Sequence, residues 1–194
     1  MLGFIFGWTS FAVHLLAFLV FNWKTARGQA RPNTATWTIW SFVTILNCAS
    51  YFVMSGDWIK ALQPLAGALA CTGTLLFALS RGRLERPGRF DLAVLAVSLV
   101  SAIVWFVWRQ AAFANLVLQA AFVISFIPTL KDVWRAPQKE SPLPWFMWGA
   151  AYLLLIAAVC VRWSGHIPDL VYPLNSFFWH ALVGVLALRR SRTR

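Results

Sequence analysis

Apolar runs about as long as a membrane-spanning helix fill nearly all of this 194-residue chain. A helix needs roughly 20 apolar residues to cross a bilayer, and short polar, charged or turn-forming separators divide the chain into segments of that kind. The stretch from Asp91 to Leu130 has room for two spans, so we place a break at Arg109-Gln110. The predicted spans are 2–21, 34–54, 59–80, 92–108, 111–130, 145–161 and 170–188.

This pattern predicts an all-α polytopic membrane protein with seven transmembrane helices. The composition agrees, because 60% of the residues are hydrophobic and only 12% are charged, too few to form the polar shell of a soluble domain. The N-terminus has no positive leader region and the first span is longer than a signal-peptide core, so we expect no cleavable signal peptide.

The basic residues indicate the orientation of the spans. Of the 17 Lys and Arg residues, 14 fall in alternate loops, and short loops rich in Lys and Arg stay in the cytoplasm. We therefore expect an odd number of spans in a bacterial inner membrane, with the N-terminus outside and the C-terminus in the cytoplasm. Loop positions explain the net charge of +11 better than a nucleic-acid-binding face does. The predicted cytoplasmic set is Lys24, Arg27, Arg31, Arg81, Arg83, Arg86, Arg89, Lys131, Arg135, Lys139, Arg189, Arg190, Arg192 and Arg194; the opposite set is Lys60, Arg109 and Arg162.

The chain contains an internal repeat. Trp37-Thr38-Ile39-Trp40 reappears as Trp145-Phe146-Met147-Trp148. After a slip of one residue, Gly56, Pro64, Leu65, Ala78, Leu79, Arg81 and Arg83 align with Gly165, Pro173, Leu174, Ala187, Leu188, Arg190 and Arg192. We therefore predict a triple-helix repeat in 1–90, a linker helix in 91–109 and a second repeat with a basic cytoplasmic tail in 110–194. Because one span joins the repeats, they are parallel about an axis along the membrane normal, and the linker is expected to lie outside any site.

A local motif supports this plan. Phe126-Ile127-Pro128-Thr129 is followed by a basic loop, then by Ser141 and the second tryptophan pair; Arg31-Pro32-Asn33 precedes Trp37, although Val20-Phe21 holds no proline. The chain thus resembles the SWEET/PQ-loop superfamily, whose helices are arranged three plus one plus three, with Pro128-Thr129 standing where a Pro-Gln pair ends a helix. Bacterial nicotinamide riboside carriers are similar in helix plan. The resemblance implies a transporter with proline hinges.

Polar residues deep within spans are candidates for lining a solute pathway, because a polar group in hydrocarbon needs an internal partner or a water-filled cavity. Residues four apart share a helix face, and amides with aromatic rings suit a neutral polar ligand such as a sugar, nucleoside or vitamin. The alternative is that these amides only join neighbouring helices. The predicted substrate-binding residues are Asn47, Tyr51, Asn115, Gln119, Asn175 and Trp179.

Prolines and histidines within spans carry further hypotheses. Pro64, Pro128 and Pro173 can kink their helices and act as hinges, or can simply be tolerated near helix ends. His14 and His180 can be proton-linked, or can be satisfied packing residues. No charged residue lies in the middle of a span, which disfavours a proton pump. Eight tryptophans are interpreted as interfacial belts: Trp23, Trp37, Trp134 and Trp145 inside, and Trp58, Trp105, Trp108 and Trp163 outside.

Three functions remain open from the sequence. The leading one is a facilitative transporter of a small neutral polar solute that works by alternating access. The first alternative is a receptor or assembly partner that uses basic cytoplasmic loops, and the second is an intramembrane enzyme built on Ser176 and His180. We expect no enzyme activity, cofactor or metal, since there is no phosphate-binding glycine loop or His-Glu-x-x-His motif. The bilayer is the expected partner, and the small residues Ala66, Ala70 and Thr74 would allow a homo-oligomer.

Overall fold

The computed structural model describes residues 1–27, 34–81 and 86–189. Within them lie seven long α-helices and one short 3₁₀ turn, η1 (Pro137–Lys139). The helices are α1 (Leu2–Ala26), α2 (Thr34–Ser55), α3 (Trp58–Ser80), α4 (Arg89–Trp108), α5 (Ala111–Arg135), α6 (Pro142–Val161) and α7 (Pro168–Leu188). The predicted cytoplasmic residues Arg31, Arg83, Arg190, Arg192 and Arg194 lie outside the described residues, as does the Arg31-Pro32-Asn33 motif.

All seven helices are long and apolar enough to cross a membrane, which confirms the predicted all-α, seven-helix character. The break that the sequence predicts at Arg109-Gln110, between the fourth and fifth spans, is confirmed too. α4 ends at Trp108, and the next residue, Arg109, has a left-handed φ of 55°. This conformation stops a helix because it cannot continue its hydrogen bonding.

Two predicted helix ends are wrong. α1 and α5 continue to Ala26 and Arg135, several residues beyond the apolar runs from which their ends were read. Polar residues in these last turns make tertiary contacts: Asn22 Nδ2 donates to Thr74 Oγ1 at 3.0 Å, and Lys24 donates to Ser141. Pro128 consequently lies inside α5 and does not end it.

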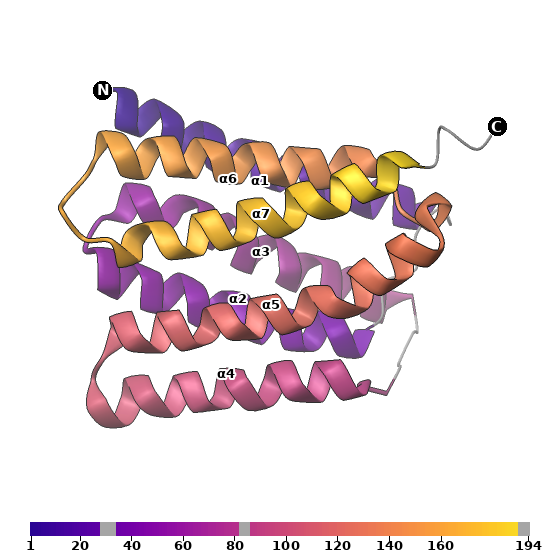
Figure 1. Ribbon diagram of the computed structural model, residues 1–194, viewed down its shortest axis with the longest axis horizontal. Helices are drawn as coiled ribbons and strands as arrows, with labels where there is room; N and C mark the ends of the chain where they lie inside the picture. The colour runs from indigo at the N-terminus through magenta and orange to yellow at the C-terminus, as the bar shows by residue number, and fades with distance from the viewer. Residues whose placement is uncertain (28–33, 82–85, 190–194) are drawn as a thin grey trace.

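The helices run alternately in opposite directions, so α1 begins at one end of the bundle and α7 finishes at the other (Figure 1). We call the end where α1, α3, α5 and α7 finish the basic end. Among the described residues it carries Lys24, Arg27, Arg81, Arg86, Arg89, Lys131, Arg135 and Arg189. The opposite end holds the short turns before α3, α5 and α7.

Helix packing is the same in the two parts of the chain that flank α4. α3 packs against both α1 and α2, and α7 packs against both α5 and α6. The two groups meet through α1 against α6 and through α2 against α5. α4 packs on α5 and α2, and its Ser101 hydroxyl donates to the Ala114 carbonyl oxygen at 2.6 Å. The interior lies between the two groups of three helices.

Candidate functional site

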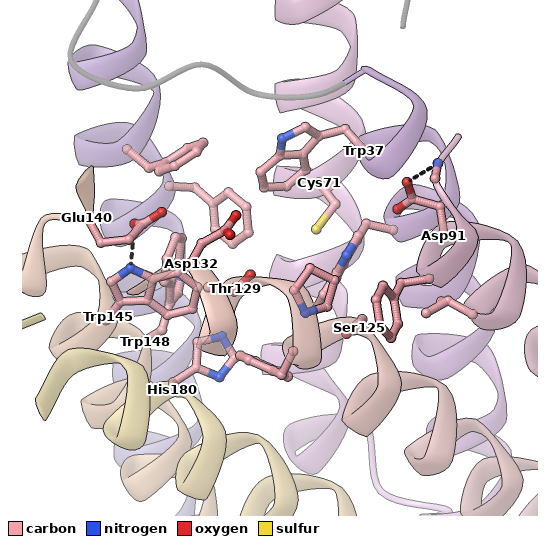
Figure 2. A pocket seen from close by; sticks show the side chains of 18 of the residues that line it. Trp37, Cys71, Asp91, Ser125, Thr129, Asp132, Glu140, Trp145, Trp148 and His180 are labelled. Atoms are coloured by element: carbon pink, nitrogen blue, oxygen red, sulfur yellow. Dashed lines mark hydrogen bonds between the residues drawn. The ribbon is translucent and has the colours of Figure 1, made fainter. Parts of the chain in front are cut away.

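A cavity of about 460 Å³ lies between the two groups of helices and extends to the basic end (Figure 2). Helices from both groups and the start of α4 contribute to its wall. Among the described residues, the wall is formed by Phe18, Phe21, Trp37, Trp40, Cys71, Gly88, Arg89, Phe90, Asp91, Val94, Ser125, Phe126, Pro128, Thr129, Asp132, Glu140, Trp145, Trp148 and His180. The first turns of α4 contribute Arg89, Phe90, Asp91 and Val94 to this wall. That the linker helix lies outside the functional site stays a prediction.

Aromatic rings dominate the wall and interlock across it. Phe18 of α1 lies 5.0 Å from Trp148 of α6, centroid to centroid, and Phe126 of α5 lies 6.1 Å from Trp40 of α2. Both pairs meet edge to face, the arrangement that ring quadrupoles favour. Trp145 adds a further edge contact to Trp148 at 5.2 Å. Both groups of helices therefore build the aromatic surface of the wall.

Carboxylates stand on the wall close to the basic end. Figure 2 shows Glu140 and Asp132 on one side of the cavity and Asp91 on the other. Glu140 Oε2 accepts a hydrogen bond from the Trp145 indole Nε1 at 3.0 Å. Burial raises the pKa of Glu140, the Trp145 hydrogen bond lowers it in part, and the charge of Asp132 raises it further, so the net pKa lies above its usual value. Asp91 Oδ2 accepts from the Gly88 backbone N–H at 2.8 Å at the start of α4.

One indole on the wall lacks a hydrogen-bond partner. Trp148 is only 4% exposed, and its Nε1 has no partner among the described residues. Leaving a buried donor unpaired costs about 1–3 kcal/mol. Trp145 and Trp148 therefore differ, because the Trp145 indole N–H donates to a carboxylate and the Trp148 indole N–H has no acceptor among the described residues.

Between the cavity and the end opposite the basic end, a chain of polar side chains crosses the interior. Gln63 Nε2 lies 2.9 Å from His14 Nδ1, and Gln63 Oε1 accepts from the Tyr172 hydroxyl at 3.0 Å. The hydroxyls of Tyr172 and Tyr152 lie 3.3 Å apart. The ring of Tyr152 packs against His180, with centroids 5.0 Å apart. These contacts fill the space between the cavity and the opposite end.

A fully buried ion pair lies at the opposite end. Lys60 Nζ and Asp169 Oδ2 are 2.7 Å apart, and their side chains are 1% and 0% exposed. His166 Nδ1 lies 2.8 Å from the other carboxylate oxygen of Asp169. The Tyr51 hydroxyl donates to the Asp169 backbone oxygen at 2.7 Å. Four segments of the chain, including both groups of helices, are thus tied together here.

A second ion pair lies nearer the surface of the same end. Arg162 Nε is 2.6 Å from Asp57 Oδ2, while Asp57 Oδ1 accepts from the Ile59 N–H at 2.9 Å and caps α3. Burial acts to raise the pKa of Asp57, but the hydrogen bonds from Arg162 and Ile59 and the charges of Arg162 and Lys60 outweigh it, so the net pKa is below the usual 3.8. The opposite end is therefore closed by two ion pairs.

Five of the six predicted substrate-binding residues come together, but away from the cavity wall. Asn115 Nδ2 donates to Asn47 Oδ1 at 3.1 Å, and Gln119 Nε2 donates to the same oxygen at 3.3 Å. Asn175 Nδ2 donates to Gln119 Oε1 at 3.2 Å, and Trp179 Nε1 to Asn175 Oδ1 at 2.8 Å. This amide network joins α2, α5 and α7. Tyr51, the sixth, lies at the closed end, and the substrate-binding role of all six stays a prediction.

The remaining predicted residues are distributed as follows. Pro64, Pro128 and Pro173 all lie inside helices, and Pro128 lines the cavity. His180 lines it too, while its Nδ1 lies 2.7 Å from the Ser176 backbone oxygen. His14 is buried against Gln63. Hinge and proton-linked roles stay predictions.

The small-residue strip and the tryptophan belts need revision. Ala66 and Thr74 are fully buried within the protein, so these two positions pack inside the bundle. A homo-oligomer stays a prediction. Trp37 and Trp145, interpreted as belt residues, line the cavity. Their repetition as the first members of the two Trp-x-x-Trp motifs was the signal that could have placed them there. Trp23, Trp58, Trp108, Trp134 and Trp163 are exposed, as a belt requires.

Sequence reasoning also missed the buried pair of Lys60 and Asp169. Lys60 falls at the start of the predicted span 59–80 and Asp169 just before the predicted span 170–188, and neither carries a local motif. The fold and the site together define the class of this protein: a seven-helix bundle, each helix apolar enough to cross a membrane, with an aromatic cavity toward one end and ion pairs at the other. No protein-family model, curated protein or solved structure matches this chain.

Proposed function

We propose that this protein is a facilitative transporter of a small polar solute that works by alternating access between two parallel triple-helix units. The observation that carries the proposal is the cavity between the two groups of helices, with the passage beyond it closed by side chains from both. A volume of about 460 Å³ falls within the range of small-molecule sites. By the positive-inside rule the basic end is cytoplasmic, so the solute enters or leaves the cavity there.

Contacts between equivalent residues support a twofold relation between the units. Lys60 and Asp169 are 109 residues apart and form an ion pair. Gln63 and Tyr172 have the same spacing and form a hydrogen bond. Under a twofold rotation, only equivalent residues on the axis meet each other. The proposed axis therefore passes through these two contacts, along the bundle and between the units.

The aromatic wall supports the same relation. Phe18 contacts Trp148 of the other unit at 5.0 Å, and Phe126 contacts Trp40 at 6.1 Å. Each contact becomes the other when the units are exchanged. In parallel-repeat transporters the solute site lies at the interface of the repeats and the repeats rock about it. Both units contribute residues to this cavity, which favours a transporter over a receptor with an apolar, filled bundle.

Side-specific thiol labelling tests alternating access without knowledge of the solute. We would introduce Ser125→Cys, on the cavity wall, in a chain whose native cysteines are changed to Ala, and treat right-side-out and inside-out vesicles with a membrane-impermeant maleimide. A carrier exposes this position to both sides in turn, so we expect fast labelling from the cytoplasmic side and slower labelling from outside.

Two matched positions control for orientation and leakage. Arg27→Cys should react only from the cytoplasmic side, and Arg109→Cys only from outside, because these residues lie at the two ends of the bundle. If Ser125→Cys never reacts from outside while Arg109→Cys does, the protein does not alternate. The receptor hypothesis would then replace the transporter.

A further inference from the structure

We propose that the cavity binds a small organic cation of the ammonium class that also carries a hydrogen-bond acceptor. This inference rests on the proposed function and names its solute class. It replaces the expectation of a neutral solute with one derived from the charge and the rings of the wall.

Acidic residues are concentrated on the wall against the trend of the chain. The protein has 17 basic and only 6 acidic residues. Three of the acidic ones, Asp91, Asp132 and Glu140, line the cavity, beside a single Lys or Arg, Arg89, among the described residues. This occurs at the end of the bundle where basic residues gather. Three carboxylates repel an anionic solute, whereas they attract a cation.

The rings of the wall suit the same ligand. Trp37, Trp40, Trp145 and Trp148 all border the cavity. The faces of indole rings attract cations, and cages of aromatic rings bind quaternary ammonium groups.

The unpaired indole adds a second requirement. Trp148 Nε1 is a buried donor without a partner among the described residues, and an indole N–H can only donate. A bare cation offers nothing to accept this hydrogen bond. A ligand with a hydroxyl or carbonyl oxygen near its ammonium group would satisfy the indole and the wall charges together.

Choline and its uncharged isostere provide the direct test. In 3,3-dimethylbutan-1-ol a carbon atom replaces the nitrogen, so shape and hydroxyl are kept while the charge is lost. Isothermal titration of the purified full chain should give an affinity for choline at least tenfold higher than for the alcohol. Glu140→Gln should remove most of this preference by weakening choline binding alone. Equal affinities for the two compounds, loss of both in Glu140→Gln, or no binding of choline would overturn the proposal.

A second comparison tests the acceptor. Trp148→Phe should weaken choline binding about tenfold and leave tetramethylammonium, which has no acceptor, within about twofold. Trp134→Phe is the matched control, because Trp134 is 62% exposed and outside the cavity wall. Equal losses for choline and tetramethylammonium would show that Trp148 acts only through its ring. Because binding is measured in detergent and alternation by labelling in vesicles, either proposal can fail while the other stands.

Discussion

At the scale of single residues, the buried pair of Lys60 and Asp169 matters most. Removing two charges from water is costly, and their attraction offsets this only when geometry and further hydrogen bonds are good. Asp169 meets this condition, since Lys60 and His166 each take one carboxylate oxygen. The ion pair is therefore compatible with a stable fold. Removing either partner, however, leaves the other as a buried charge without compensation.

Lys60→Met and Asp169→Leu should each destabilise the protein by about 3–5 kcal/mol, because each leaves an uncompensated buried charge. The double variant Lys60→Met/Asp169→Leu should regain most of the loss, since it buries no lone charge. Thermal unfolding in detergent would measure all three. A double variant no more stable than the singles would show that other contacts at this end, and not the charge balance, decide stability.

Residue roles were only partly readable from the sequence. Polarity within apolar spans singled out Asn47, Asn115 and Gln119, and they do gather in one buried network. Polarity could not say whether such residues face a cavity or another helix, because that depends on how the helices are rotated in the bundle. For the same reason the sequence predicts an interfacial position for Trp37, whereas the structure places it on the cavity wall.

At the scale of helices, close approach between α1 and α3 depends on a glycine. A Cβ added at Gly7 would lie 2.6 Å from Ile59 Cγ2 and 3.1 Å from the Ile59 backbone oxygen. The second contact is with backbone and cannot be relieved by a rotamer change. Glycine at this position lets the two helices touch, as small residues do in membrane bundles generally.

Gly7→Ala should lower the free energy of unfolding by about 1–3 kcal/mol, the usual cost of overpacking. Gly73→Ala is the matched control, because an added Cβ there meets nothing within 4 Å. That substitution should be neutral or raise stability by up to about 1 kcal/mol through helix propensity. The comparison uses thermal midpoints in the same detergent. Similar midpoints for the two variants would contradict the close-approach argument.

Helix positions were predictable because hydrophobic length is a strong local signal. The number of helices and the break at Arg109 are confirmed. The predicted ends of α1 and α5 are wrong, because a helix can continue beyond its apolar run where its polar residues make tertiary contacts. Asn22 forms a hydrogen bond with Thr74, which is distant in the sequence, and no local sequence pattern predicts that contact.

At the scale of the whole molecule, the alternation of helices and the distribution of basic residues predict the topology. Single cysteines at Arg27 and Arg135 should react with an impermeant reagent only from the cytoplasm, and one at Arg109 only from outside. A fluorescent protein fused after the C-terminus should report a cytoplasmic location. Labelling of Arg27→Cys and Arg109→Cys from the same side would contradict the seven-span arrangement.

The repeat can be proposed from the sequence because the same Trp-x-x-Trp spacing occurs at Trp37–Trp40 and Trp145–Trp148. The ion pair of Lys60 and Asp169 on the proposed axis could not be predicted in this way, because the two positions carry unlike residues and a repeat search does not align them.

That unlikeness has a consequence for how such a bundle can be assembled. If the first unit paired with a second copy of itself around the same axis, Lys60 would face Lys60, and two buried ammonium groups would repel. If the second unit did so, two Asp169 carboxylates would face each other. Only a heterologous pair brings opposite signs together. In the proposed arrangement, joining the two units in one polypeptide therefore does more than tether them, because it supplies the asymmetry that neither self-associated unit has.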